Sequence, residues 1–246
     1  MKVRTLDFFK IKFINDDYRF IIKYLLKKKG YLVAPAASSL VNIAKDHHYL
    51  KALQKSSVAI LDSGFFCLLI LFLKLKIVKK FSGYKFIKSF INDENLKNFK
   101  ILSLESTIKN LNKNKYLLKS KKFKFTRHYL CPIYKQDLLY DKKLITLIIK
   151  YKPKIIIINI GGGVQEKLAL YIKNSISWKI SIVCTGAALS FISDTSTFFK
   201  INNFIDKYYL GWLARSLSNP TFFYERVLKS FKLFFLVFKS KIKFNY

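Results

Sequence analysis

The stretch that most constrains the fold is residues 155–166, which read IIIINIGGGVQE. An apolar, β-branched run without polar alternation is typical of a strand that is buried on both faces. The three glycines after it allow a sharp turn and a close backbone approach to a ligand. A helix is expected from Glu166 to about Lys173, and its first N–H groups would lack intrahelical partners. Strand, glycine turn and helix N-terminus often hold a phosphate in α/β proteins, although a turn without a ligand has the same pattern.

The segments on either side of this stretch alternate between strand-like and helix-like patterns. Short apolar runs predict strands at residues 31–34, 58–61, 99–104, 155–159 and 180–184. The longer stretches between them predict helices at residues 17–29, 40–54, 65–78, 109–124 and 141–150. Strands that alternate with helices favour a mostly parallel sheet with right-handed crossovers. We therefore expect an α/β fold with a Rossmann-like, mostly parallel sheet flanked by helices in residues 1–200.

The chain is extremely basic. It has 46 Lys and Arg against 14 Asp and Glu, a formal net charge of +32 in 246 residues. Such a charge indicates an anionic partner, which could be nucleic acid, anionic lipid or a phosphorylated substrate. The chain is also crowded with Ile, Asn, Phe and Tyr, which have AT-rich codons, so the base composition of the gene is an alternative source of the lysines. Because the lysines are spread along the whole chain, the charge permits an anionic partner without selecting one.

The cysteines and the apolar runs bear on the cellular compartment. Cys67, Cys131 and Cys184 are odd in number and far apart, which argues against a disulfide framework or a structural zinc site and fits a reducing compartment. The N-terminus lacks the pattern of a signal peptide. The longest apolar run, residues 65–73, is shorter than the roughly 20 residues that a membrane-spanning helix needs. We therefore expect a cytoplasmic protein that is peripheral to a membrane.

The C-terminal part, residues 201–246, differs in character and is predicted to be a helical appendage. One helix is expected at residues 206–217, and Asn219 and Pro220 have the sequence of a helix start. The helix from Pro220 to about Lys239 mixes phenylalanines with Lys and Arg, a composition that suits a membrane surface. The alternative is a helix that packs on the core while its lysines reach into solvent. We favour the membrane because the apolar residues exceed one narrow stripe.

Several motifs, in order, resemble one family. IGGGVQEK, CTGAALSF and LGWLARSLSNPTFFYER are similar to three motifs of the WecG/TagA/CpsF glycosyltransferases, glycosyltransferase family 26. VAILDSG matches a strand of that family that ends in Asp-Gly, and the basic-x-x-Gly element of the family has its counterpart in residues 80–83. The resemblance covers about residues 30–238, and the LGWLARSLSNPTFFYER segment is its most specific part.

The resemblance implies an inverting transferase that moves an N-acetylmannosamine-type sugar from a UDP-sugar to a polyprenyl-diphosphate-linked acceptor at the inner face of the membrane. It implies no obligatory metal or other cofactor. Asp62 matches the position of the family's proposed base, and a carboxylate at a strand end can take the proton of an acceptor hydroxyl. The alternative role for Asp62 is that of a helix cap or turn residue.

The same resemblance assigns the substrate-binding residues. Backbone N–H groups and arginines can stabilise the charge of a leaving UDP. The residues expected to bind substrate are Gly161, Gly162, Gly163, Gln165, Glu166, Gly186, Arg215 and Arg226. For Arg215, a surface ion pair is the alternative.

Two other functions remain open. Ala36 or Ala37 stands where the family has asparagine, Leu189 replaces an aspartate and Gly211 a glutamate, so a non-catalytic, membrane-associated scaffold is one alternative. A basic nucleic-acid-binding protein is the other, but the chain has no recognition-helix, zinc or RNP signature, and we expect no nucleic acid as partner. Self-association into a homo-oligomer is left open.

Overall fold

The computed structural model describes residues 4–134, 139–193 and 220–245, except for the side chains of residues 220–224, 226 and 227. The strands are β1 (Thr5–Phe8), β2 (Ile11–Ile14), β3 (Gly30–Val33), β4 (Val58–Ile60), β5 (Lys100–Glu105), β6 (Phe125–Leu130), β7 (Ile155–Asn159), β8 (Ser181–Cys184) and β9 (Lys243–Asn245). The helices are α1 (Tyr18–Lys28), α2 (Ala37–Leu40), α3 (His47–Gln54), α4 (Gly64–Lys74), α5 (Gly83–Ile91), α6 (Ile108–Ser120), α7 (Lys142–Tyr151), α8 (Val164–Ser175), α9 (Ala188–Ser193) and α12 (Pro220–Lys239), with 3-10 helices η1 (Val41–Ala44) and η2 (Glu94–Leu96).

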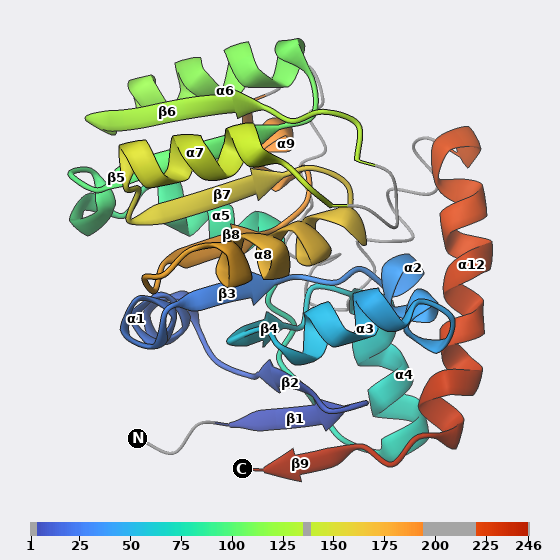
Figure 1. Ribbon diagram of the computed structural model, residues 1–246. Helices are drawn as coiled ribbons and strands as arrows, with labels where there is room; N and C mark the ends of the chain where they lie inside the picture. The colour runs from blue at the N-terminus through green and yellow to red at the C-terminus, as the bar shows by residue number, and fades with distance from the viewer. Residues whose placement is uncertain (1–3, 135–138, 194–219, 246) are drawn as a thin grey trace.

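The strands form one 9-stranded sheet in the order β6-β5-β7-β8-β3-β4-β2-β1-β9. Every neighbouring pair from β6 to β2 is parallel, whereas β1 pairs antiparallel with both β2 and β9. Helices cover both faces of the sheet (Figure 1). The expected α/β fold with a mostly parallel, Rossmann-like sheet and a C-terminal helix is therefore confirmed.

The isoleucine run forms the buried middle of the sheet. Every residue of β7 is buried, and Ile155–Ile158 have no exposed surface. The β-branched side chains alternate between the two faces, so that Ile156 and Ile158 join one hydrophobic cluster and Ile155 and Ile157 the other. A strand covered on both sides needs no polar alternation, which is why this stretch could be assigned from sequence.

Two hydrophobic clusters hold the helices to the sheet. Helices α2, α3, α4, α7, α8 and α12 contribute to the larger cluster on one face. Helices α1, α5, α6 and α9 contribute to the smaller cluster on the other face. Several helices begin with a side-chain cap: Ser63 and Thr107 each accept a hydrogen bond from a backbone N–H of the helix that follows. These caps fix where the chain leaves the carboxyl ends of β4 and β5.

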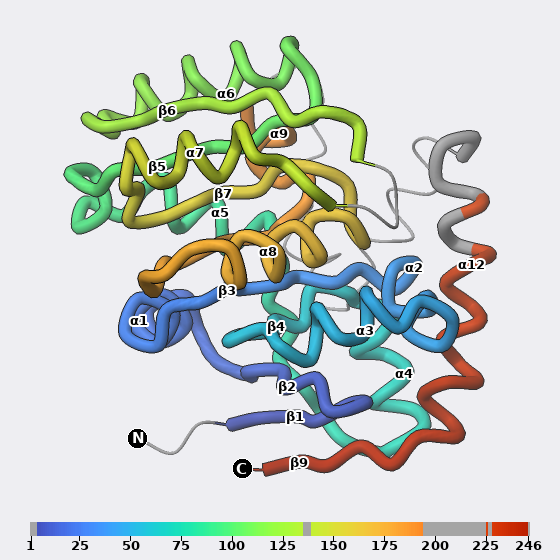
Figure 2. Tube along the Cα trace, in the orientation of Figure 1, coloured from blue at the N-terminus to red at the C-terminus, as the bar shows by residue number. Residues whose placement is uncertain are grey.

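The C-terminal helix is packed onto the same domain. Leu233 and Val237 of α12 have no exposed surface and belong to the larger cluster. After α12 the chain forms β9 beside β1, and the trace of α12 runs past α2 and α4 on its way there (Figure 2). The division of the chain near residue 200 stays a prediction, because residues 194–219, with the helix expected at 206–217, lie outside the described residues. Among the described helices, none is long and apolar enough to cross a membrane.

Several elements differ from the sequence-based expectation. The hairpin of β1 and β2, the strands β6 and β9, and helix α5 were not predicted. The segment expected to be helical at 40–54 is broken into α2, η1 and α3. The helix expected to reach residue 78 ends at Lys74, because Leu75 takes a left-handed conformation with φ 50°. These differences come from tertiary pairing or single backbone angles, which local periodicity does not encode.

Candidate active site

The carboxyl ends of the parallel strands lie at one edge of the sheet, on the right in Figure 1. The loops after β3, β4, β7 and β8 meet there. In open α/β sheets, ligands bind outside this edge, where helix N-termini point at the ligand. The predicted catalytic residue and both predicted glycine turns fall on these loops.

Asp62 follows β4 and is partly buried. Its Oδ1 accepts a hydrogen bond of 2.8 Å from the backbone N–H of Gly83, the first residue of α5. The cap of the helix that directly follows Asp62 is Ser63, whose Oγ accepts from the N–H of Phe66 at 3.1 Å. The carboxylate of Asp62 is thus held by a second helix, which fixes its orientation at the edge of the sheet.

Gly83 lies close to residues that follow three different strands, β3, β4 and β8. A Cβ on Gly83 would lie 3.1 Å from the Cβ of Thr185 and 3.2 Å from the Cβ of Ala34. Thr185 follows β8 and Ala34 follows β3, so the glycine lets α5 approach both strands while it binds Asp62 after β4. The hydroxyl of Thr185 is buried and, within the described residues, has no hydrogen-bond partner.

The glycine turn after β7 is open on its outer side. Gly163 has φ +91°, a conformation that side-chain-bearing residues rarely adopt. A Cβ built on Gly161 or Gly163 would meet no atom of the described residues within 4 Å, whereas one on Gly162 would lie 3.0 Å from Oγ of Ser39. The turn therefore faces α2, and no described residue fills the space next to Gly161 and Gly163.

Gln165 and Glu166 are buried and hold the two turns together. Oε2 of Glu166 accepts from the N–H of Gly163 at 2.7 Å, and its Oε1 accepts from Nε2 of Gln165 at 3.0 Å. Oε1 of Gln165 accepts from the N–H of Gly186, which has φ +62°, at 2.8 Å. Burial raises the pKa of Glu166, although the hydrogen bonds from Gln165 and Gly163 act in the opposite direction. Both side chains thus fix the turn after β7 against the turn after β8.

The remaining predicted site residues are placed only in part. Arg215 lies outside the described residues, and so does the side chain of Arg226, which belongs to α12. Leu189, where the resemblance led us to look for an aspartate, has no exposed surface and belongs to the smaller hydrophobic cluster. Ala36 is the N-cap position of α2 and makes no side-chain cap. The roles of all predicted site residues stay predictions.

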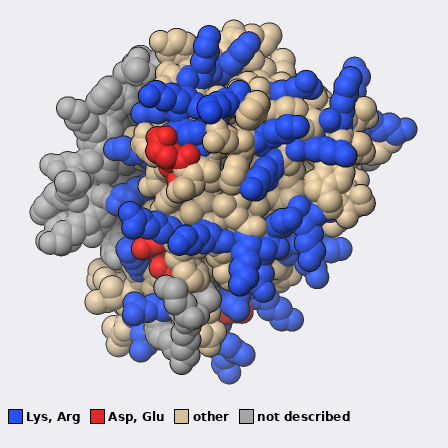
Figure 3. Space-filling view, turned by 90° about the vertical axis from the view of Figure 1, so that its left-hand side faces the viewer, with Lys and Arg blue, Asp and Glu red and all other residues tan. Residues whose placement is uncertain are grey.

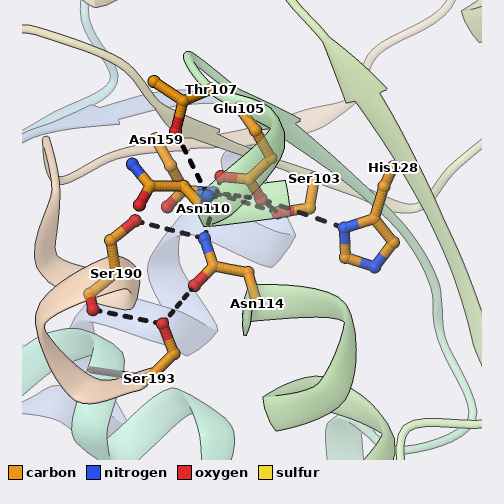
Figure 4. A network of polar contacts seen from close by, with 9 residues as sticks. All are labelled: Ser103, Glu105, Thr107, Asn110, Asn114, His128, Asn159, Ser190 and Ser193. Atoms are coloured by element: carbon orange, nitrogen blue, oxygen red, sulfur yellow. Dashed lines mark hydrogen bonds and ion pairs between the residues drawn. The ribbon is translucent and has the colours of Figure 1, made fainter. Parts of the chain in front are cut away.

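A buried polar network near this edge was missed by sequence analysis (Figure 4). Glu105, the last residue of β5, has no exposed surface. Its Oε1 accepts from Oγ of Ser103 at 2.6 Å and from Nδ2 of Asn159 at 3.1 Å, and its Oε2 accepts from Nδ2 of Asn114 at 2.8 Å. Nδ1 of His128 lies 3.9 Å from Oε1 of Glu105. A carboxylate directly after an apolar strand was the available signal, the same one that singled out Asp62.

The network connects both turns of the candidate site. Asn159 ends β7, two residues before Gly161. Asn114 on α6 donates to Oγ of Ser190 at 3.3 Å and accepts from Oγ of Ser193 at 2.7 Å, and both serines lie on α9, the helix after the Gly186 turn. Within the described residues, no three His, Cys, Asp or Glu side chains come together as metal ligands.

The fold defines a Rossmann-like α/β protein, and the carboxyl edge of its sheet is the candidate ligand site. The chain matches the model of the glycosyl transferase WecG/TagA/CpsF family over residues 7–245, and it belongs to that family. A comparison with curated proteins gives no match. The family match extends through α12 and β9, so the C-terminal elements are part of the family's domain.

Proposed function

We propose that the protein transfers an N-acetylhexosamine-type sugar, similar to N-acetylmannosamine, from a UDP-sugar to a polyprenyl-diphosphate-linked acceptor in surface polysaccharide synthesis. The observation that carries the proposal is the fixed carboxylate of Asp62 at the same edge of the sheet as the turns at Gly161–Gly163 and Gly186. Membership of a glycosyltransferase family gives the reaction class. The sugar, donor and acceptor rest on the resemblance of the motifs.

In this mechanism Asp62 acts as general base. Its carboxylate takes the proton of the acceptor hydroxyl as that oxygen attacks the anomeric carbon from the face opposite the leaving group. The bond from the anomeric carbon to the β-phosphate oxygen of UDP breaks, and UDP leaves with the electron pair, so the configuration inverts. The Gly83 N–H bond to Oδ1 keeps the carboxylate aimed at the edge of the sheet.

The glycine turn and the start of α8 supply the UDP site in this proposal. Backbone N–H groups at a helix N-terminus favour negative charge, and the open space above Gly161 and Gly163 admits a diphosphate. In this proposal Gln165 and Glu166 do not contact UDP themselves; they position the glycine turns to which they are hydrogen-bonded. Arg215 and Arg226 would add charge-assisted hydrogen bonds to the leaving phosphate.

We further propose that α12 attaches the protein to the inner face of the cell membrane. The helix buries Leu233 and Val237 but exposes several of its other described apolar side chains, and so do the end of α4 beside it and the residues that follow. The exposed fractions are 50% for Phe231, 39% for Phe234, 63% for Phe235, 62% for Phe238, 70% for Phe72, 84% for Leu75 and 79% for Ile77. Exposed lysines accompany these side chains: Lys76, Lys232, Lys239 and Lys241. An apolar surface bordered by cations suits an anionic bilayer.

Point substitutions test this attachment better than truncation, because removing residues 206–246 would also remove β9 and the buried Leu233 and Val237. Phe235→Ser with Phe238→Ser is expected to abolish sedimentation with anionic liposomes. Ile108→Ser with Tyr116→Ser, two exposed apolar residues on α6, is the matched control. Unchanged sedimentation of the Phe235/Phe238 variant would contradict the membrane role of α12.

The transfer itself is tested with purified protein and labelled UDP-N-acetyl sugars together with a lipid-diphosphate acceptor. We expect thermal stabilisation by UDP and by UDP-sugars, and acceptor-dependent release of UDP. Guanosine and cytidine diphosphates serve as controls. Absence of any uridine-nucleotide binding would contradict the proposal.

A non-catalytic scaffold is the alternative, and the burial of Leu189 in the smaller hydrophobic cluster is the observation that favours it. The family aspartate expected at this position would be available to a ligand, but a leucine in the core is not. Binding to liposomes without any binding of nucleotide sugars would select this alternative.

A further inference from the structure

The amino ends of the parallel strands form the edge of the sheet opposite to the candidate active site. Exposed lysines stand at or just before the start of five neighbouring strands, in the spatial order β6, β5, β7, β8 and β3. We call these residues the lysine row: Lys124, Lys100, Lys154, Lys179 and Lys29. Figure 3 shows this side of the molecule, where Lys and Arg side chains outnumber Asp and Glu.

Backbone pairing fixes how these lysines follow one another. The N–H of Lys154 donates to the carbonyl of Lys100 at 2.8 Å, and Lys29 directly precedes Gly30, which pairs with Ser181 two residues after Lys179. Neighbouring strands are about 4.8 Å apart, so the row spans on the order of 20 Å. Five positive charges at this spacing repel one another unless a linear anion lies along them.

Helix termini account for only part of the row. A lysine at a helix C-terminus is favoured by the helix dipole, and Lys29 and Lys152 are the C-cap residues of α1 and α7. Lys154 follows the C-cap of α7 by two residues, so the dipole of that helix favours a cation there as well. Lys100, at the start of β5, follows only the short 3-10 helix η2 and has no such explanation. The sequence scatters these residues over 150 positions, and only the parallel sheet brings them into line.

Two adjoining hollows lie along the row, with volumes of about 480 and 390 Å³. Both are lined by Lys29, Trp178 and Lys179, and no described Asp or Glu lines either one. Lys173 lines the smaller hollow, and its pKa is lowered, first by burial and then by the charge of Lys55. The hollows are therefore a site of uncompensated positive charge.

Aromatic side chains are interleaved with these cations. Trp178, where the two hollows meet, is partly exposed and packs in part against the larger core cluster. Phe125, at the start of β6, is 50% exposed. The ammonium group of Lys154 lies 3.6 Å from the centre of the Phe99 ring. Cations that follow a phosphate backbone, with aromatic faces on which bases stack, are the usual arrangement for binding single-stranded nucleic acid.

The position of the row separates it from the proposed membrane surface. Figure 1 places α12 beside the carboxyl edge, whereas the lysine row lies at the opposite edge. A bilayer against α12 would therefore leave the row facing away from the membrane. A polyphosphate has no bases, so it would have no group that stacks on Trp178 and Phe125.

We propose that the lysine row binds single-stranded nucleic acid, with phosphates on the lysines and bases on Trp178 and Phe125. This site goes beyond the proposed transfer reaction and does not depend on it. It revises the expectation drawn from the sequence, which was that nucleic acid is not a partner of this protein.

The test measures the anisotropy of a fluorescently labelled 12-nucleotide oligouridine with the full chain over a range of salt concentrations. Each single-strand phosphate contact contributes about −0.7 to the slope of log K against log salt, so five contacts predict a slope of about −3.5. Lys29→Gln/Lys154→Gln/Lys179→Gln should reduce its magnitude by about 2. Lys100→Gln/Lys124→Gln is a second variant, for the case that the triple variant does not fold.

The matched control is Lys109→Gln/Lys115→Gln/Lys119→Gln on α6, which removes the same charge from another surface. It should leave the slope unchanged, and Phe125→Ala should weaken binding by about tenfold through lost stacking. An equal loss in the α6 variant would overturn the proposal, because binding would then follow total charge. Equally tight binding of inorganic polyphosphate with no effect of Phe125→Ala, or row-dependent binding of anionic vesicles in place of oligouridine, would overturn it as well.

Discussion

The two edges of the same sheet have opposite chemistry. At the carboxyl edge, the backbone N–H of Gly83 holds Asp62, and the buried side chains of Gln165 and Glu166 accept hydrogen bonds from the glycine turns. At the amino edge, the lysine row is exposed, and its hollows have no described carboxylate in their lining. Hydrogen bonds between elements thus characterise the carboxyl edge, whereas a row of positive charges characterises the amino edge.

This difference follows from the geometry of a parallel sheet. Helices begin near the carboxyl ends of the strands, so unpaired N–H groups and caps converge there and hold a carboxylate or phosphate in a defined place. At the amino ends the helices that precede the strands end, and their dipoles favour cations, so lysines gather at the strand starts. We therefore expect substitutions at the carboxyl edge to affect stability and chemistry, and those at the amino edge to affect binding of anions.

The largest effect on stability is expected from the buried carboxylate of Glu105. Glu105→Ala removes the acceptor of Ser103, Asn114 and Asn159 in a site without solvent, so we expect a loss of about 3 kcal/mol in the free energy of unfolding. Glu94→Ala in the exposed η2, on the amino side of the same strand, should cost less than about 1 kcal/mol. Urea denaturation measures the free energy of unfolding of both variants. Equal losses would contradict the expected difference between the two edges.

A smaller effect is expected from the glycine turn. Gly163→Ala places a side chain at φ +91°, which should cost about 2 kcal/mol and weaken UDP binding because the turn shifts. Gly161→Ala, where a Cβ meets no described atom within 4 Å, is the control for lost flexibility alone. Calorimetric titration with UDP checks the pair. Equal affinities would show that the turn does not form the nucleotide site.

Gly83→Ala tests the convergence of the strand ends. Its Cβ would press on Thr185 and Ala34 at 3.1 and 3.2 Å, and the resulting shift of α5 should move the N–H that holds Asp62. We expect about 1 kcal/mol of lost stability and a larger relative loss in kcat than in UDP affinity. Lys29→Gln/Lys154→Gln/Lys179→Gln at the amino edge should leave kcat unchanged. A transfer defect in this triple variant would contradict the separation of the two edges.

The smallest effect concerns a partly buried ion pair between Asp46, the N-cap of α3, and Lys167 of α8. Partial burial of Asp46 opposes its ionisation, but hydrogen bonds from Lys167 and the N–H of Tyr49 outweigh it and lower the pKa of the carboxyl. The stabilisation is therefore present above about pH 4 and is lost as the pH falls through the lowered pKa. Asp46→Asn keeps a capping residue but loses the charge, and should change stability by less than about 1 kcal/mol at neutral pH. Its Tm should fall less steeply than that of the wild type below pH 4, and parallel curves would contradict this.

Much of the fold at the carboxyl edge was predictable from sequence. The isoleucine run, the glycine turn and Asp62 after an apolar strand are local signals, and the structure places them as strand β7, its turn and the end of β4. The motifs also identified the family, which the match over residues 7–245 confirms. The roles of Asp62 and of the glycine turns in transfer stay predictions.

The missed elements depend on partners far away in the chain. β9 exists only because β1 lies beside it, with Asn245 opposite Thr5. The turn between β1 and β2 uses Phe9 and Lys10 at positive φ, where sequence reasoning looks for glycine or asparagine. β6 is an edge strand, and its residues Phe125–Leu130 have no clean alternation of apolar and polar side chains. The lysine row could not be predicted from sequence for the same reason, because the order and register of five strands bring its residues together.

The most direct test of the central claim is the activity of Asp62→Asn, with Asp7→Asn on β1 as the matched control. The amide keeps an oxygen that can accept from the N–H of Gly83 but cannot take a proton from the acceptor. We expect the rate of sugar transfer in a single turnover to fall by about 10²- to 10⁴-fold, while the affinity for UDP stays within about twofold of the wild type. A transfer rate in Asp62→Asn equal to that of the wild type would contradict the assignment of the base and of the active site to this edge of the sheet.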